Sequence, residues 1–148
     1  MAHWLLKTEP SEYAFEDLVR EQETAWTGVS NPQAQANLRA MREGDRAVIY
    51  HSGEKRAVGV AEVVRAAYRD PGAKDGGELV CVDVRAVEQL PAPVPLEALK
   101  QEPTFEGSAL LRQGRLSVVP LSPAQWQDIC DLAEVIAKTG GLRRKKRF

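Results

Sequence analysis

The sequence is poor in the residues that build metal sites and disulfides. It has only two cysteines and two histidines in 148 residues, and without a CxxC pair a structural zinc site lacks ligands. Cys81 lies in an apolar strand pattern and Cys130 on the apolar face of a helix pattern, so we expect both to be inert core residues. The sequence therefore predicts no metal and no cofactor.

Motifs that cradle nucleotide phosphates or activate a serine are also missing. There is no Walker-type or GxGxxG loop and no GxSxG nucleophile elbow. His51 and Ser52 are neighbours, but adjacent residues on a strand point to opposite faces and rarely form a nucleophile–base pair. Carboxylates are scattered rather than paired. These absences favour a binding protein over an enzyme, with no catalytic residue.

Long apolar runs are absent as well. None approaches the roughly 20 residues of a membrane span, and the first residues lack the pattern of a signal peptide. Hydrophobic residues make up 43% of the chain, which is enough for one packed core. We expect a soluble, cytoplasmic, monomeric protein with one domain over residues 1–138 and a flexible tail over residues 139–148.

Charge is unevenly spread along the chain. Residues 143–147 are all basic, and without them 15 basic residues face 21 acidic ones, a net charge of −6. Such a body does not suit a protein that grips long duplexes by neutralising phosphates. The tail is either a disordered, solubilising end or a source of attraction to a nucleic-acid backbone. The candidate backbone contacts are Arg143, Arg144, Lys145, Lys146 and Arg147.

Hydrophobic periodicity and capping signals predict an α+β chain. Asn31-Pro32 is typical of a helix start, residues 122–125 form a capping box, and the last helix is expected to end at Gly140-Gly141. The expected strands are 3–7, 46–51, 57–67, 79–87 and 116–119, and the expected helices are 15–20, 32–44, 96–100 and 123–139. Strands and helices do not alternate strictly, which favours a mixed sheet curled toward a barrel over a doubly wound sheet.

Four segments combine an apolar anchor with hydrogen-bonding groups that no packing pattern requires: residues 4–10, 26–31, 50–53 and 112–117. Brought together, they would form a pocket suited to a planar heterocycle. We therefore expect Trp4, Trp26, His51 and Arg115 to line one concavity, and Trp26→Ala to abolish binding at a modest cost in stability.

Each of these residues also has a plainer interpretation. The tryptophans can be core residues, His51 a satisfied strand histidine, and Arg112 and Arg115 solvated cations. Lys7 and Glu9 lie on one strand face, where an exposed ion pair contributes little. Asn37 lies on the apolar face of its helix and is interpreted as an anchor for a loop.

Taken together, the segments resemble the EVE domain family of the PUA-like superfamily. The family pattern W-L-x-K-x-E-P, W-x-G-V-x-N, N-L-R-x-M, G-D, Y-H-S and R-x-x-R-L-S-V-x-P is matched in order from Trp4 to Pro120, and the resemblance continues to about Ile129. It implies a PUA-like mixed β pseudo-barrel flanked by α-helices. It also implies a pocket for a modified base, such as 5-methylcytosine or its hydroxymethyl form, flipped from DNA or RNA.

By position, the resemblance implies a set of ligand-binding residues. The pocket set is Trp26, Asn31, His51 and Ser52, and the polar rim is Lys7, Glu9, Arg112, Arg115 and Ser117. Trp4, Val29 and Ser30 complete the candidates. The chain departs from many relatives at Ser30 and Pro32, at Gln35 and at Gly114, where relatives carry Arg, Tyr, Arg and Ser.

Three functions stay open from the sequence. The leading hypothesis is a non-enzymatic reader of a modified nucleobase in DNA or RNA. The second is a binding protein or enzyme for a free base or another small, nucleoside-like heterocycle. The third is a structural interaction module.

Overall fold

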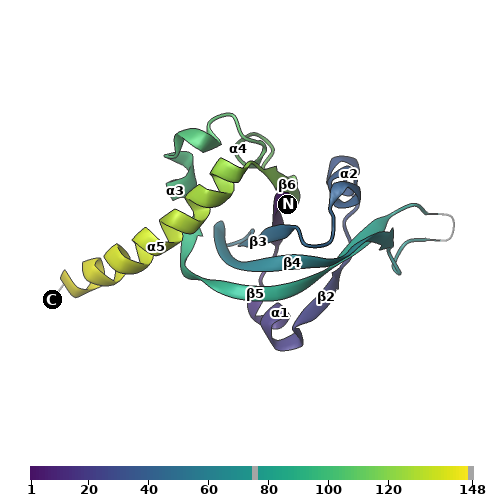
Figure 1. Cartoon of the computed structure of the whole chain (residues 1–148), viewed down its shortest axis with the longest axis horizontal. Helices are drawn as coiled ribbons and strands as arrows, with labels where there is room; N and C mark the ends of the chain where they lie inside the picture. The colour runs from purple at the N-terminus through teal and green to yellow at the C-terminus, as the bar shows by residue number, and fades with distance from the viewer. Residues whose placement is uncertain (75–76, 147–148) are drawn as a thin grey trace.

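The computed structural model describes residues 1–74 and 77–146, with side chains described as far as residue 139. A single sheet and its flanking helices make up the described chain (Figure 1). In chain order the elements are β1 (His3–Thr8), α1 (Phe15–Glu21), β2 (Glu23–Trp26), α2 (Pro32–Ala40), β3 (Arg46–His51), β4 (Arg56–Arg69), β5 (Val80–Pro95), α3 (Leu96–Lys100), η1 (Pro103–Phe105), α4 (Ala109–Arg112), β6 (Val118–Leu121) and α5 (Pro123–Lys146).

The sheet is mixed and strongly bent. Its strand order is β2-β5-β4-β3-β1-β6, with β1 parallel to β3 and the other neighbours antiparallel. The register between β4 and β5 shifts at four places, and such bulges bend a strand and increase its twist. Figure 1 shows β4 and β5 as long curved ribbons, 14 and 16 residues in length. This curvature brings the two ends of the sheet toward each other.

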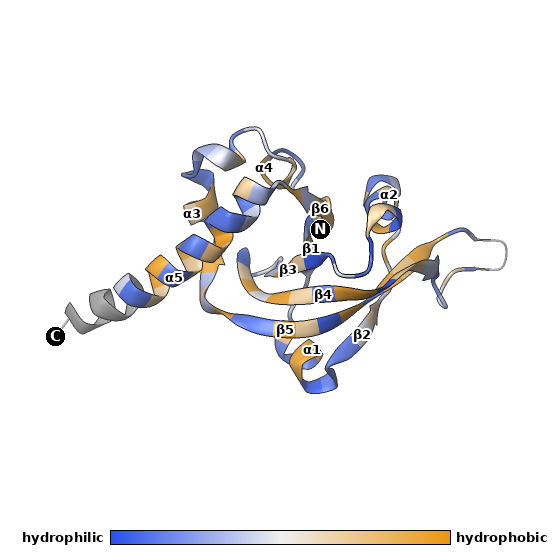
Figure 2. Cartoon of the chain, viewed as in Figure 1, coloured by the Kyte–Doolittle hydropathy of each residue, from blue (hydrophilic) through white to orange (hydrophobic). Residues whose placement is uncertain are grey.

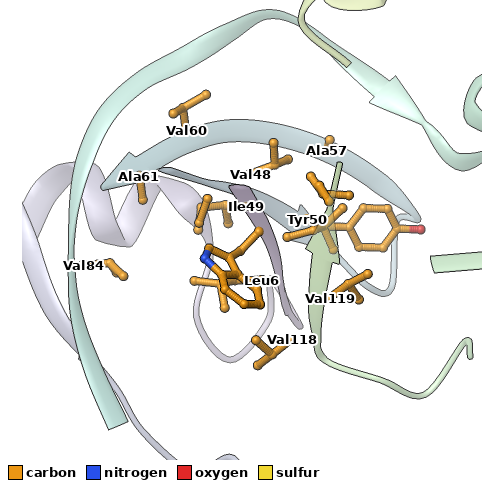
Figure 3. Close-up of a cluster of buried hydrophobic side chains, with 14 of the residues drawn as sticks. Leu6, Val48, Ile49, Tyr50, Ala57, Val60, Ala61, Val84, Val118 and Val119 are labelled. Atoms are coloured by element: carbon orange, nitrogen blue, oxygen red, sulfur yellow. The ribbon is translucent and has the colours of Figure 1, made fainter. Parts of the chain in front are cut away.

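The core fills the concave side of the sheet. Figure 3 shows side chains from β1, β3, β4 and β6 converging on one cluster, among them Leu6, Val48 and Val118, all of which are fully buried. Hydrophobic residues recur along β4 and β5 and along the part of α5 nearest β5 (Figure 2). Val82 and Val84 are buried as the alternation predicts, but so is Cys81 on the opposite face of β5, because β5 is covered on both faces there.

Several element boundaries differ from the expected ones. The sequence pattern did not predict β2 or α4, and β5 continues through Pro91, Pro93 and Pro95 instead of ending at Val87. These prolines alternate, so their missing N–H groups all fall on one edge of the strand. The opposite edge stays free to pair with the start of β4, where Ala57 is opposite Val94. Proline is tolerated in strands in this arrangement.

The start of α5 is confirmed and its end is not where we expected it. Ser122 Oγ accepts a hydrogen bond from the Gln125 N–H (3.1 Å), and Gln125 Oε1 accepts one from the Ser122 N–H (2.9 Å). The expected stop at Gly140-Gly141 is wrong, since the helix continues to Lys146. Each glycine costs a helix interior only about 1 kcal/mol relative to alanine. The five basic side chains at residues 143–147 lie outside the described side chains.

Gly59 is the point where α1 packs against the sheet. A Cβ placed on Gly59 would lie 2.3 Å from Phe15 Cζ, and both residues are buried. We therefore expect Gly59→Ala to lower the free energy of unfolding by about 1–3 kcal/mol, the usual cost of overpacking a core. Urea unfolding measures the change. Gly114→Ala is the control, because a Cβ there meets nothing within 4 Å. Equal stability of the two variants would contradict this packing.

Candidate functional site

A cavity lies where the curled sheet fails to close. Its volume is about 270 Å³, and one wall is formed by Lys7 and Thr8 of β1 while the other is formed by residues 24–27, in and just after β2. In the sheet these two strands are separated by β5, β4 and β3, so the cavity is the seam of an incomplete barrel. We call it the seam cavity.

Two aromatic rings line the seam cavity at right angles. The ring centroids of Trp26 and Tyr13 are 6.1 Å apart with an interplanar angle of 86°, the edge-to-face geometry that aromatic pairs prefer. The Tyr13 hydroxyl donates to Glu21 Oε1 (2.7 Å), and the Thr8 hydroxyl donates to the Tyr13 carbonyl (2.6 Å). Desolvation and the hydrogen bond to Glu21 raise the pKa of Tyr13 to about 12. The Tyr13 ring is thus held in place as one wall of the seam cavity, and its hydroxyl stays protonated at neutral pH.

The loop that follows Trp26 is held in place by two buried polar side chains. Gly28 has φ +80° and donates its N–H to Asp70 Oδ2 (3.0 Å), and a left-handed φ suits glycine. Gln35 donates to the Val29 carbonyl (2.6 Å) and also bonds the N–H and carbonyl of Val80. Both Asp70 and Gln35 are buried. They connect the wall of the cavity to β5 and to the end of β4.

Three candidate residues lie in this loop and differ in exposure. Val29 is buried, and its carbonyl is taken by Gln35. Asn31 Oδ1 accepts from the Ala34 N–H (2.9 Å), which makes Asn31 the N-cap of α2, as the sequence predicted. Ser30 is exposed. Val29 and Asn31 shape the loop, and contact of any of the three with a ligand stays a prediction.

His51 does not share the seam cavity with Trp26. It lines a different cavity of about 420 Å³, beside Phe15. Its Nε2 accepts from the Phe15 N–H (3.0 Å) and its Nδ1 lies 2.8 Å from Glu54 Oε1. Because Nε2 must accept, the ring proton is on Nδ1 and is donated to Glu54. The expectation of one concavity is therefore wrong for His51, whose ring anchors the start of α1.

Trp4 is a core residue. It is buried, and its indole N–H donates to Asp45 Oδ2 (3.0 Å). It lies three residues from Lys7 on β1, about 10 Å along the strand, so it is at the opposite end of β1 from the seam cavity. The expected place of Trp4 in the pocket is wrong because a buried indole N–H requires a partner, which Asp45 supplies within the core.

Ser52 lines another cavity, of about 240 Å³, that also includes Lys7. We call it the Lys7–Lys55 cavity, and its lining is Lys7, Tyr50, Ser52, Lys55, Leu96, Leu110 and Gly114. Lys7 Nζ donates to the Gly114 carbonyl (2.9 Å), and the Lys7 N–H donates to the Ser117 carbonyl (2.9 Å). The first and fourth segments of the sequence are thus joined. One concavity was expected, and the structure has two that share Lys7.

The charged rim residues are arranged differently from the expected pairs. The amine of Lys7 bonds Gly114, while the Glu9 carboxylate accepts from the Ser11 hydroxyl (3.3 Å). Glu9 lies directly against Gly53, where an added Cβ would be 2.6 Å from Glu9 Oε2. Arg112 and Arg115 are exposed. These arginines agree with the plainer interpretation of solvated cations, and binding by them stays a prediction.

Sequence reasoning missed several residues of the two cavities. Tyr13 and Thr24 lie in short segments without a periodic pattern, and no sequence signal identifies them. Lys55 lies three residues after Ser52, the end of the Y-H-S segment, and was not singled out. Asn37, interpreted as an anchor for a loop, donates to the carbonyl of Val118 (2.7 Å), the first residue of β6, and so anchors a strand.

The described part of the chain lacks a metal-binding cluster and a helix that could cross a membrane. Residues 1–74 and 77–146 contain no group of three or more His, Cys, Asp or Glu side chains placed to hold a metal ion. The helices of that part are all too short or too polar to cross a membrane. Cys81 and Cys130 are free thiols, and burial raises the pKa of each.

Known proteins share both the sequence pattern and the fold. The sequence-family model of the EVE domain matches residues 2–132 of this chain. The NMR structure of Rpa0253 from Rhodopseudomonas palustris is 42% identical, covers 92% of this chain and 95% of its own, and superposes with a TM-score of 0.85.

A human protein is also similar over most of the chain. Human thymocyte nuclear protein 1 is 30% identical over 90% of this chain and 74% of its own length. The crystal structure of human THYN1 in complex with 5-methylcytosine-containing DNA is 31% identical, covers 90% of this chain and 98% of that chain, and has a TM-score of 0.76. The expected PUA-like mixed fold is confirmed. The chain belongs to the EVE domain family.

Proposed function

We propose that the protein binds a modified nucleobase of DNA or RNA in the seam cavity and performs no chemistry on it. The observation that carries the proposal is the corner formed by the rings of Trp26 and Tyr13, in a cavity that Lys7 and three threonines also line. A family member, human THYN1, has been crystallised with DNA that contains 5-methylcytosine. This supports 5-methylcytosine as the first ligand to test.

The seam cavity has the chemistry that a base requires. A base stacked on an aromatic ring gains about 1–3 kcal/mol. Among the described residues, the edge strand β2 pairs with β5 alone, so in that part of the chain its backbone N–H and C=O groups on the other side have no strand partner. Such groups suit the hydrogen-bonding edge of a base. A volume of about 270 Å³ lies below the usual range for drug-sized ligands, which favours a single ring system.

A base in a duplex must leave the stack to reach this cavity. Flipping costs a few kcal/mol, and the cost is smallest where the base is already single-stranded or mispaired. A stacking corner with nearby hydrogen-bonding groups offsets part of that cost. We therefore expect single-stranded ligands to bind more tightly than duplexes of the same sequence.

Catalysis on the same scaffold is the weaker alternative. A nucleophile needs an adjacent general base within hydrogen-bonding reach. Both ring nitrogens of His51 are engaged, one by the Phe15 N–H and one by Glu54, so His51 is not available to activate Ser52. This arrangement favours binding over hydrolysis.

The test is a titration with oligonucleotides that differ at one base. We expect a strand with one 5-methylcytosine to bind about fourfold more tightly than the unmodified strand, because burying one methyl group gains about 0.8 kcal/mol. Fluorescence anisotropy measures both affinities, in DNA and RNA, with the hydroxymethyl form and the free nucleosides as further ligands. Equal affinity for every strand would contradict base recognition, and a preference for free nucleosides would favour the small-molecule alternative.

A further inference from the structure

The Lys7–Lys55 cavity is rich in hydrogen-bond donors. Its lining includes two lysine side chains and the hydroxyls of Tyr50 and Ser52, against an apolar wall of Leu96 and Leu110. Gly114 also lines the cavity, and its carbonyl already accepts a hydrogen bond from the Lys7 amine. Such a set suits an anion.

Lys7 lines both cavities, and its amine contacts residues of the Lys7–Lys55 cavity. Its ammonium has three protons, and the Gly114 carbonyl takes one of them at 2.9 Å. The nitrogen lies 5.7 Å from the centre of the Tyr50 ring. Desolvation by burial lowers the pKa of Lys7, so this cation has lost part of its hydration and would be stabilised by an anion.

Tyr50 adds a hydroxyl at the edge of the core. The residue is only 3% exposed, and Figure 3 shows its ring pointing out of the apolar cluster with the oxygen at the far end. No group among the described residues forms a hydrogen bond with this oxygen. Burial raises the pKa of Tyr50, which keeps the hydroxyl protonated and able to donate.

Lys55 occupies an unusual backbone position. Its φ is +55°, a left-handed conformation that glycine and asparagine adopt far more readily than lysine. The Lys55 carbonyl accepts from the Leu96 N–H (2.9 Å) and so holds the turn in place. Since the backbone does not favour lysine there, the charged side chain in the cavity is the feature that calls for an explanation.

Two carboxylates lie near the same turn. Glu54 is bonded to His51 Nδ1 (2.8 Å) and to Arg56 Nε (3.2 Å), so its charge is met by its own partners. Glu9 lies against Gly53 and accepts from Ser11. Neither carboxylate lines the Lys7–Lys55 cavity, and the lysines remain available to an anion.

We propose that the Lys7–Lys55 cavity binds the phosphate group of the nucleotide whose base occupies the seam cavity, an inference that rests on the proposed function. Both cavities are lined by Lys7, and each, at about 270 and 240 Å³, is small for a drug-sized ligand and suits one part of a nucleotide. The shared chemistry is a phosphate ester, either of a free nucleotide or of a DNA or RNA strand.

The first experiment compares 5-methyldeoxycytidine with its 5′- and 3′-monophosphates on three proteins. The wild-type protein should bind one monophosphate at least tenfold more tightly than the nucleoside, as expected for charge-assisted hydrogen bonds. Lys55→Asn removes the charge but suits the left-handed backbone, and it should lose most of that gain. Lys138→Gln, an exposed lysine on α5, is the control and should keep it. Urea unfolding of each variant confirms that the fold is intact.

The second experiment places the phosphate in a strand. A neutral methylphosphonate linkage beside the 5-methylcytosine should weaken wild-type binding about tenfold and Lys55→Asn binding by much less. In Lys55→Asn the slope of log K against log salt should fall by about 0.7–0.9. A monophosphate gain without a methylphosphonate effect would support the phosphate cavity and identify a free nucleotide as its source.

The contrary outcomes separate the two proposals. Equal binding of nucleoside and monophosphates by the wild-type protein, or an undiminished gain in Lys55→Asn, would overturn the phosphate cavity and leave base binding standing. A different outcome would separate the proposals the other way. If the methylated and unmethylated monophosphates bind equally tightly and Lys55→Asn weakens both, the phosphate cavity is supported and the modified-base reader is contradicted.

Discussion

Trp26→Ala is expected to lower the free energy of unfolding by about 3–5 kcal/mol and to abolish base binding by the protein that stays folded. Trp26 is only 8% exposed and belongs to the main core cluster, and truncating a buried tryptophan to alanine costs about that much. The same ring is one wall of the seam cavity, so a stacked base would lose about 1–3 kcal/mol. The modest stability cost expected from the sequence is therefore revised upward.

The measurement pairs urea unfolding with ligand titration on the same preparations. Trp126→Ala is the matched control, because Trp126 is half-buried on α5 and stacks on His3 at 4.5 Å, away from the seam cavity. It should lose stability and keep its affinity. Trp26→Phe keeps an aromatic face and should bind more weakly than wild type while remaining folded. Wild-type affinity in Trp26→Ala would show that this ring serves the core alone.

Asp45→Ala is expected to lower the free energy of unfolding by about 3–5 kcal/mol at neutral pH. The Asp45 carboxylate is buried and accepts from three donors, the N–H groups of Ala2 and Arg42 and the indole of Trp4, at 2.9–3.0 Å. Its loss leaves the buried indole N–H of Trp4 unsatisfied, which costs about 1–3 kcal/mol, and it removes two part-buried bonds to the N–H groups of Ala2 and Arg42, each worth about 1 kcal/mol. Ligand affinity should persist, because Trp4 and Asp45 lie at the far end of β1 from the seam cavity.

The pH dependence of this loss has a definite sign. Desolvation alone would raise the pKa of Asp45, but the hydrogen bonds from Arg42, Trp4 and Ala2 and the nearby terminal amine outweigh it and lower the pKa below 3.8. A depressed folded-state pKa contributes stability above the unfolded value, and that stability is lost as pH falls through the folded value. The difference between wild type and Asp45→Ala should be constant from pH 7 to 5 and shrink below about pH 4. A difference that does not change with pH would contradict this role.

The strands and helices with regular periodicity could be read from the sequence. The segments of β1, β3 and α3 were placed within one residue, since Pro10, Ser52-Gly53 and Pro95 mark where these segments end or begin. β2 and α4 have four residues each and too few positions to show a period. The second half of β5 was not predicted, because it contains three alternating prolines. Proline is tolerated in a strand only where its edge is unpaired, and a sequence does not show which edge is paired.

The candidate site was predicted as a list of segments but not as a geometry. Trp26 and Lys7 do line the seam cavity, and Lys7, Ser52 and Gly114 line its neighbour. Trp4 and His51 carry the same kinds of polar groups, and only the folded chain shows that Asp45, Phe15 and Glu54 already engage them. A hydrogen-bonding side chain in a motif looks the same whether its partner is a ligand or the protein itself.

The bends in β4 have a consequence for how ligand preference could change. Since the walls of the seam cavity are joined through β5, β4 and β3, the gap between them is set by the curvature of the whole sheet. That curvature depends on the bulges along β4, including the one beside Gly59. In a selection from a random library for a larger or smaller base, some of the recovered substitutions should therefore cluster on β4, far from any atom that touches the ligand.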